Sequence, residues 1–382
     1  MLAELIRIPS VGGTRAESDV VHHVAALLRA EGVEVDEWRI PLPSLVQERD
    51  FPGMEVERTE AWGLVARVPG RGGPSLMFNA HLDVVPPGDP GAWSEHPFSG
   101  RVGPTDVHGR GACDMKGGAV AALFALLNVH RSGQAPPGDL LFAGVVGEED
   151  GGLGTYATLA RGWRADACVI PEPTDLDVLA ANGGALTFRL SVPGRAAHAS
   201  MRTRGVSAVE RFQPVFTALR ALEARRNASV DPLMSRWDIA YPLEVGMVRA
   251  GDWSSTVPDL LVAEGRFGVA LDEPVAAARR DFERCVAEVD AEVRVEWWGG
   301  QFASGRCPSD SDLVSRVLAA HGREASVLGA PYGSDLRLLT AAGIPTVQYG
   351  PGSPALAHTP QERVPIAEVL HCAETLTRLV RG

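Results

Sequence analysis

The feature that most constrains the fold is a short apolar run that ends in two adjacent carboxylates. Residues 140–146 read Leu-Leu-Phe-Ala-Gly-Val-Val, and Gly147 separates them from Glu148 and Glu149. An apolar run of this length, bounded by breakers, is typical of a strand that is covered on both faces. Both carboxylates then lie at the end of a buried strand, where removal from water is costly unless a cation compensates the charge. Taken alone, such a pair more often lies in a solvated surface turn, and only the other segments described below favour a metal site.

The rest of the chain extends this pattern. Apolar residues at helical spacing predict helices, and short apolar or alternating runs bounded by glycine and proline predict strands. Strands are predicted over 33–38, 64–68, 75–79, 140–146, 167–170 and 344–349, and helices over 16–30, 117–131, 313–320, 335–342 and 366–380. This alternation predicts an α/β domain with a mostly parallel central sheet flanked by helices. In such folds ligands bind at the carboxyl ends of the strands.

The pattern changes near Asn182. Strands are predicted over 185–192, 244–248, 260–269 and 292–298, and helices over 206–226 and 275–289. The order β-α-β-β-α-β is that of a ferredoxin-like unit, which can fold on its own core. We therefore predict an inserted domain over residues 182–298, which divides the α/β domain into residues 1–181 and 299–382.

Composition narrows the class of protein. A chain of 382 residues has room for two domains, and its net charge of −12 argues against a nucleic-acid or anionic membrane surface. The N-terminus has no secretory signal pattern, and no run approaches the roughly 18 apolar residues of a membrane span. Five widely separated cysteines without a Cys-x-x-Cys pair predict reduced thiols and a cytoplasmic location.

Five segments of the predicted α/β domain carry metal-binding side chains beside a strand end or a helix start. They contain His81 with Asp83, Asp114, Glu148 with Glu149, Glu172, and His358. Two imidazoles and several carboxylates suit a pair of Zn, Co or Mn ions better than Ca²⁺ or a thiolate zinc site. A carboxylate left over beside the metals can serve as a general base, which is the composition of a two-metal hydrolase.

Each segment also has a simpler explanation by itself. Asp114 can be the N-cap of the helix that follows, and the other residues can be polar loop residues. The glycines of residues 109–118 do not have the spacing of a dinucleotide or phosphate loop. Residues two apart on an extended chain point the same way, so we expect the Asp83 side chain to hydrogen-bond His81 and set its tautomer.

Together these segments resemble the co-catalytic di-zinc family of acetylornithine deacetylase, succinyl-diaminopimelate desuccinylase, aminoacylases and glutamate carboxypeptidase. The segments that carry the resemblance are 6–10, 81–86, 109–118, 147–149, 171–174 and 357–360, in that order along the chain. The resemblance implies that Asp114 bridges two metals, that His81 and Glu172 complete one site, and that Glu149 and His358 complete the other. It also implies Glu148 as the general base and Asp83 as the support of His81.

The resemblance extends to the predicted insert. His198, in the segment 194–200, looks like the histidine of the family's lid, which reaches the neighbouring subunit's site and stabilises an oxyanion. A homodimer through the insert is therefore expected, although without the resemblance His198 is a plain loop residue. Arg337, in a segment similar to a family motif, either holds a substrate carboxylate or lies on a helix surface, and Arg266 is a weaker candidate. Ser255 stands where the family usually carries a substrate-binding asparagine.

The function implied is hydrolysis of an N-acyl amino acid, as by acetylornithine deacetylase, with metal-activated water and Glu148 as base. No arginine occupies residues 182–185, where the desuccinylases tend to carry arginines, so we expect a short neutral acyl group such as acetyl. A dipeptidase or carboxypeptidase with the same ligands remains an alternative. From another class, a non-catalytic small-molecule binding protein on this fold remains open, although such a protein has no need of Glu148. A serine hydrolase is disfavoured because no Gly-x-Ser-x-Gly segment occurs.

Overall fold

The protein divides into two compact units in a computed structural model that describes residues 1–382. Unit 1 comprises Met1–Ala181, Arg306–Leu328 and Ser334–Gly382, and unit 2 comprises Asn182–Gly305 and Gly329–Gly333. Each unit contains an apolar core of its own. The chain returns to unit 1 later than the sequence predicts, because the last long strand of unit 2 runs to Phe302 rather than ending at Trp298.

A nine-stranded sheet forms the centre of unit 1, in the order β1-β2-β6-β3-β7-β15-β8-β13, with β14 paired to β8. Its strands are β1 (Glu34–Arg39), β2 (Trp62–Val68), β3 (Leu76–His81), β6 (Leu140–Val145), β7 (Ala167–Ile170), β8 (Val178–Asn182), β13 (Gly305–Arg306), β14 (Val327–Ala330) and β15 (Thr346–Gln348). Strand β3 pairs in parallel with β6 and β7, and β7 pairs in parallel with β15. Strands β1, β2 and β8 pair antiparallel towards the borders. The predicted parallel centre is confirmed.

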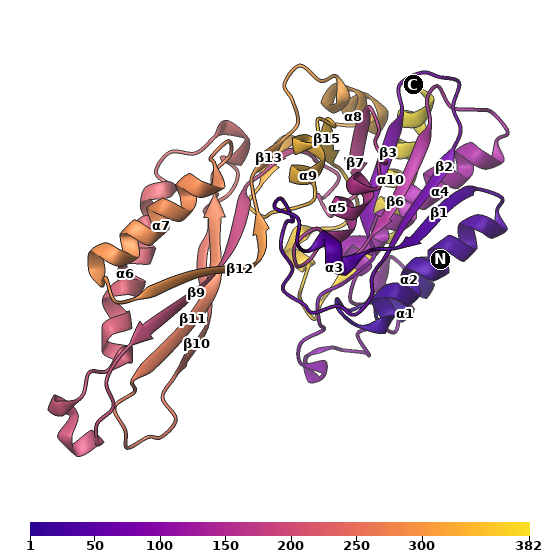
Figure 1. The fold of residues 1–382 in the computed structure, drawn as a ribbon. Helices are drawn as coiled ribbons and strands as arrows, with labels where there is room; N and C mark the ends of the chain where they lie inside the picture. Colours follow the sequence, from indigo (N-terminus) through magenta and orange to yellow (C-terminus); the bar gives the residue numbers. More distant parts are fainter. The chain divides into compact units, whose positions relative to one another are not determined.

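Helices cover both faces of this sheet (Figure 1). Helices α2 (Arg15–Ala30), α4 (Gly117–Arg131) and α10 (Ile366–Arg381) lie on one face, and α5 (Leu153–Ala160) and α9 (Leu336–Ala341) lie on the other. Successive side chains of β1 point to opposite faces of the sheet, so neighbouring residues contact helices of different layers. Glu37 accepts a hydrogen bond from Arg29 of α2, whereas the neighbouring Asp36 accepts one from Arg161, directly after α5.

The remaining elements of unit 1 are short or lie at its edges. They are α1 (Leu2–Arg7), α3 (Leu42–Leu45), α8 (Leu313–His321), the 3-10 turns Pro90–Ala92 and Pro354–Leu356, the irregular turn Ala112–Lys116, and a small sheet of β4 (Arg101–Val102), β5 (Asp106–His108) and β16 (Arg363–Pro365). This small sheet joins the segment before the irregular turn to the segment before α10.

Helix α4 is apolar nearly all round. With the turn that precedes it, the segment Ala112–Arg131 is long and apolar enough to cross a membrane, which differs from the sequence expectation. Of its apolar window, 83% is buried inside the protein. A central core helix has the same composition, so length and hydropathy alone are weak evidence for a span.

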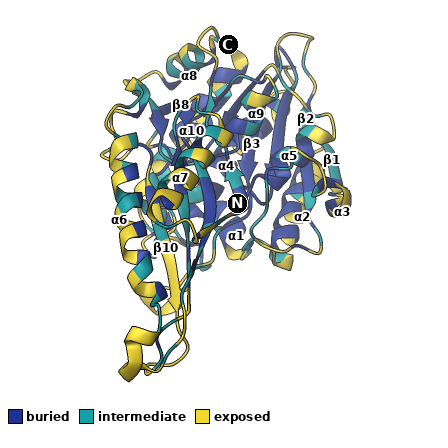
Figure 2. Ribbon diagram, turned by 60° about the vertical axis from the view of Figure 1, so that its left-hand side comes forward, coloured by how far each residue is buried: buried dark blue, intermediate teal, exposed yellow.

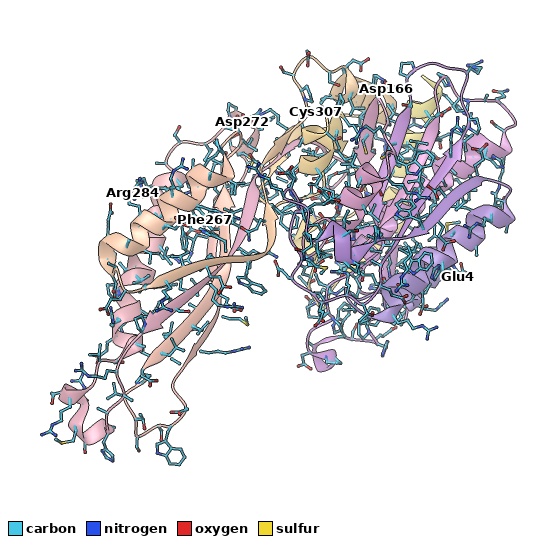
Figure 3. All side chains as sticks on the ribbon, in the orientation of Figure 1. Glu4, Asp166, Phe267, Asp272, Arg284 and Cys307 are labelled. Carbon is cyan, nitrogen blue, oxygen red and sulfur yellow. The ribbon has the colours of Figure 1, made fainter.

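Unit 2 has a four-stranded antiparallel sheet in the order β10-β11-β9-β12. Its elements are β9 (Gly184–Pro193), α6 (Ala208–Arg226), β10 (Leu243–Ala250), β11 (Leu260–Val269), α7 (Val275–Val289) and β12 (Arg294–Phe302), with 3-10 turns at Ala199–Arg204 and Pro232–Met234. Phe267 of β11, labelled in Figure 3, packs on Phe282 of α7 with ring centroids 5.0 Å apart. Helices on one face of this strand order confirm the predicted ferredoxin-like unit. Figure 2 shows that β10, at one edge of the sheet, is largely exposed.

Candidate metal centre

Three of the predicted ligand segments follow parallel strands that end at the same edge of the sheet. His81 is the last residue of β3, and it lies opposite Val145, the last residue of β6. Glu148 and Glu149 follow β6, and Glu172 follows β7. Because the carboxyl ends of parallel strands meet at one edge, side chains from distant parts of the chain converge there.

Two glycines allow this convergence. Gly147 has φ +70°, a left-handed conformation that lets the chain turn between β6 and Glu148. At Gly118, in the first turn of α4, a Cβ atom would lie 1.7 Å from the carbonyl oxygen of Pro171. The start of α4 can therefore pack directly against the segment that carries Glu172.

The other two ligand segments are loops. Asp114 lies in the irregular turn Ala112–Lys116, immediately before α4. His358 follows the 3-10 turn Pro354–Leu356 and has φ +61°. A left-handed backbone is uncommon for a residue other than glycine, and such conformations gather at functional sites.

The carboxylate of Asp114 lies between the two imidazoles. Its Oδ1 is 3.1 Å from His81 Nε2, and its Oδ2 is 3.3 Å from His358 Nε2. Glu172 Oε2 lies 3.8 Å from His81 Nε2, and Glu149 Oε2 lies 3.2 Å from His358 Nε2. Two sets of ligands, His81 with Glu172 and His358 with Glu149, thus share one bridging carboxylate.

Several carboxyl groups are buried close together at the ligand cluster, which disfavours their charged forms. Burial, with Asp335 and Glu172 nearby, raises the pKa of Glu148 well above its ordinary value. Burial also raises the pKa of Glu172, and Asp114 and Glu149 add to the effect. These carboxylates repel one another in a poorly solvated space, so a bound cation would stabilise their charged forms.

The pKa values of the two imidazoles are raised as well, which for a histidine favours the charged form. Hydrogen bonds to Asp114 and Glu149 raise the pKa of His358 to about 11. Burial by itself lowers the pKa of His81, but Glu172 and Asp114 outweigh it and raise the pKa well above the ordinary value. Since a ligating imidazole must be neutral, metal binding here would release protons.

The residues present fit divalent metal ions. Ligand atoms of His81, Asp114 and Glu149 lie within 4.8 Å of one another, and so do those of His81, Glu148 and Glu172. Glu149 Oε1 is buried and has no hydrogen-bond partner, which a cation would satisfy. Nitrogen and carboxylate donors without thiolates suit Zn, Co or Mn.

Asp83 supports the site in a different way from that expected. His81 Nδ1 lies 3.0 Å from the backbone carbonyl oxygen of Asp83, whereas the nearer carboxylate oxygen is 3.8 Å away. The carboxylate instead accepts a hydrogen bond from the backbone N–H of Glu149, at 3.3 Å. The carbonyl sets the orientation of the ring, and Nε2 remains directed at the other ligands. Burial raises the pKa of Asp83 to about 7.

Arg337 is buried beside the turn that follows the twin acids. It is 4% exposed, and its guanidinium donates to the carbonyl oxygens of Ser334, at 2.8 Å, and Gly151, at 2.7 Å. These bonds tie the start of α9 to the turn after Glu149. A contact with a substrate carboxylate remains a prediction.

The other predicted residues belong to unit 2. His198 is exposed, and the strand-like bridge between His198 and Thr256, with a hydrogen bond from Ala199 N to Ser255 O at 2.8 Å, places Ser255 beside it. Arg266 lies on β11, with its guanidinium 5.8 Å from the ring centroid of Phe302.

A buried ion-pair network was missed by the sequence analysis. Arg58 forms two-pronged hydrogen bonds with Glu17 of α2 and with Asp150, at 2.8–2.9 Å, and all three residues are almost fully buried. Asp150 directly follows Glu149, so the network anchors the turn that carries the twin acids. Glu17 lies in line with the apolar stripe of α2, and an acid on such a stripe is a usable signal, but nothing local marks Arg58.

Comparison with known proteins agrees with this geometry. The model of Peptidase family M20/M25/M40 matches residues 77–382. A succinyl-diaminopimelate desuccinylase of Gluconacetobacter diazotrophicus is 30% identical, over 96% of this chain and 92% of that protein. An N-formyl-4-amino-5-aminomethyl-2-methylpyrimidine deformylase of Halalkalibacterium halodurans is 27% identical, over 80% and 78% of the two chains.

Solved structures share the fold at lower identity. A metallo-carboxypeptidase of Sulfolobus solfataricus aligns with a TM-score of 0.81 at 15% identity, over 100% of this chain and 97% of that one. A dinuclear metal-binding peptidase of Bacillus subtilis aligns with a TM-score of 0.67 at 15% identity, over 99% and 96%. The family match over most of the chain, with the ligand geometry, shows that this protein belongs to Peptidase family M20/M25/M40 and is a metallohydrolase that cleaves amide bonds.

Proposed function

We propose that this enzyme is a deacylase that releases a short acyl group from an N-acyl amino acid. The relatives that are a desuccinylase and a deformylase support the choice of a deacylase, and the observation that carries the hydrolytic step is the position of Glu148. It is 8% exposed and lies beside both His81 and Glu172, yet the pairs that face Asp114 are complete without it. A spare carboxylate at a metal pair is suited to proton transfer rather than to ligation.

The residues divide the chemistry among themselves. Two divalent ions, most simply Zn, with Co or Mn as substitutes, would polarise the amide carbonyl and acidify the attacking water when bound. Glu148 takes the proton from that water and transfers it to the amine that leaves. Asp83 holds His81 in one orientation through its backbone carbonyl, which keeps the ligand geometry constant during the proton transfer.

Acetyl and succinyl are the two candidates for the acyl group that the enzyme removes. The absence of cationic side chains from residues 182–185 favours a neutral group such as acetyl; in the structure Asn182 of this segment is buried and donates to the carbonyl of Tyr332. The desuccinylase that is 30% identical over nearly its full length favours succinyl, which adds a second carboxylate. We place acetyl first on the side-chain argument and keep succinyl as the second candidate.

A substrate panel tests the proposal. N-acetyl, N-formyl and N-succinyl derivatives of the same amino acids would be compared with dipeptides of matched length, and kcat/KM would be measured for each. We expect hydrolysis of the acylated amino acids, with acetyl preferred over succinyl by at least about tenfold, which corresponds to about 1.4 kcal/mol. A preference for succinyl would identify the second candidate, and activity confined to dipeptides would refute the deacylase assignment in favour of a dipeptidase.

We further propose a cytoplasmic homodimer formed through unit 2, in which His198 of one subunit serves the site of the other. The exposure of His198 and of the edge strand β10 supports this arrangement, and the five free cysteines are compatible with a reducing compartment.

A further inference from the structure

Behind the bridging carboxylate lies a second buried ion pair, Arg110 with Glu362. The two residues are 2% and 1% exposed. Their side chains form an ion pair through Arg110 Nη1 and Glu362 Oε2. They are separated by 252 positions in the sequence, and neither is one of the predicted ligands.

Glu362 also holds the backbone of the bridging ligand. Its Oε1 accepts hydrogen bonds from the backbone N–H of Cys113, at 3.1 Å, and of Asp114, at 3.2 Å. Its own carbonyl accepts from the N–H of Gly109, at 3.1 Å. One carboxylate oxygen from a distant part of the chain therefore holds two backbone N–H groups of the turn that carries Asp114.

The same residue belongs to the loop that carries His358. The backbone N–H of Glu362 donates to the carbonyl of Thr359, at 3.4 Å, and β16 begins at the next residue. Glu362 thus connects the two loops that supply Asp114 and His358. The strands of the large sheet position the other ligands, whereas Asp114 and His358 lie beyond the ends of the paired strands β5 and β16, where Glu362 makes the next contacts between the two loops.

Arg110 fixes the orientation of Glu362. Its guanidinium lies 5.2 Å from the ring centroid of Trp93 and donates to the carbonyl of Pro86, at 3.4 Å. An arginine that is both stacked and paired presents its donors in one fixed plane. The carboxylate is therefore locked with one oxygen on the guanidinium and the other on the two backbone N–H groups.

We propose that Arg110 and Glu362 form a positioning pair that sets the separation of Asp114 from His358 and thereby the affinity for the metal ion that His358, Glu149 and Asp114 would share. The pair touches neither substrate nor metal and acts through the backbone of the ligands. Hydrogen-bond partners of metal ligands typically change metal affinity or activity by about 10- to 100-fold when they are altered.

The decisive experiment is metal titration of Glu362→Gln without substrate. The apo-protein would be titrated with Co²⁺, followed by visible absorbance, and with Zn²⁺ in competition with a chromophoric chelator. Glutamine keeps one acceptor oxygen but turns an amide N–H₂ towards Arg110. The His358 side chain is 54% exposed and that of His81 1%, so we assign the weaker of two binding events to the site of His358. We expect this event to lose about 10- to 100-fold in affinity while the stronger changes less. We also expect kcat to fall with KM nearly unchanged, and excess metal to restore part of kcat.

A matched control exists in unit 2. Glu273 accepts from Arg226, at 3.0 Å to Nη1, and from the backbone N–H of Ala270, at 2.9 Å, so it makes the same two kinds of bond away from the ligand cluster. Glu273→Gln should lower Tm as Glu362→Gln does, but leave metal stoichiometry, metal affinity and kcat unchanged.

Arg110→Lys provides a second variant if Glu362→Gln does not fold, as judged by circular dichroism. Lysine keeps the charge but loses the stacked fork, and it should give a smaller loss of the same metal affinity. Unchanged metal affinity in the folded variants would overturn the proposal, and so would a loss of Tm with wild-type metal binding. Because the titration uses no substrate, its result is independent of which acyl group the enzyme removes.

Discussion

At the scale of single residues, Glu148 and Glu149 are neighbours in sequence with different surroundings. Glu149 faces His358 at 3.2 Å and is held through its backbone by Asp83. Glu148 is buried near Asp335 and Glu172, which with burial raise its pKa. Adjacent residues on a turn point in different directions, so one carboxylate can ligate while the other stays available for proton transfer.

Glu148→Gln separates these two roles. The change keeps the size of the side chain but removes the base, so we expect kcat to fall by about 10²- to 10⁴-fold while metal content and Tm stay near wild type. Glu149→Gln should instead lose metal. Steady-state kinetics and elemental analysis of both variants would measure this difference, and a Glu148→Gln enzyme with wild-type turnover would assign the base to another residue.

At the scale of elements, α8 and α10 meet at a buried pair of histidines. His321 Nδ1 lies 2.8 Å from Tyr349 Oη and 3.2 Å from His371 Nε2. Burial lowers the pKa of both histidines, and Arg323 and Arg378 add to the effect, while Asp177 near His321 and Glu374 near His371 oppose it. The packing of these helices therefore depends on neutral imidazoles.

The pH dependence of stability follows from the direction of these shifts. The unfolded chain has histidine pKa values of about 6.5, so below that pH it binds more protons than the folded protein. The stabilisation is complete above about pH 7 and is lost as the pH falls through 6.5 towards the lowered folded values. The raised pKa values of Asp83, Glu148 and Glu172 act on stability in the opposite direction, so the effect of the histidine pair is measured as a difference between two proteins. We expect the Tm of His371→Gln, relative to that of the wild type, to rise as the pH falls from 7 to 5. The exposed His23, changed to Gln, serves as the control, and an unchanged slope in His371→Gln would contradict this explanation.

Elements with strong periodicity were predicted and weaker ones were not. The bounds of β11 and α7 agree with the sequence pattern because each has a regular apolar face. Helix α5 was missed because its eight residues include a glycine and two threonines, which have weak helix propensity. Strand β8 was missed although its four apolar residues follow the same pattern as the other buried strands.

At the scale of the whole molecule, the edge of unit 2 bears on assembly. Strand β10 has only one neighbour in its sheet, and Met247 and Val248 on it are 44% and 51% exposed. An exposed apolar edge strand is a template for pairing with a second chain.

Val248→Lys tests this interface. A charge on the edge strand opposes pairing, so we expect the mass measured by light scattering to fall from that of a dimer to that of a monomer, with a loss of kcat if His198 acts across the interface. Val289→Lys, at the exposed end of α7, provides the control, since it should change neither mass nor activity. A wild-type protein that is monomeric at micromolar concentration would refute the dimer.

The sequence by itself determined the two kinds of domain and the identity of the side chains gathered at the metal centre. Apolar periodicity defines strands locally, and parallel strands bring whatever follows them to one edge, so His81, Glu149 and Glu172 could be placed before any contact was known. Only the tertiary structure decided what surrounds them: the backbone carbonyl of Asp83 on His81, the burial of Arg337, and the support of Asp114 by Glu362. These contacts join segments far apart in the chain, and their geometry depends on packing and loop conformation, for which the sequence carries no local periodic signal.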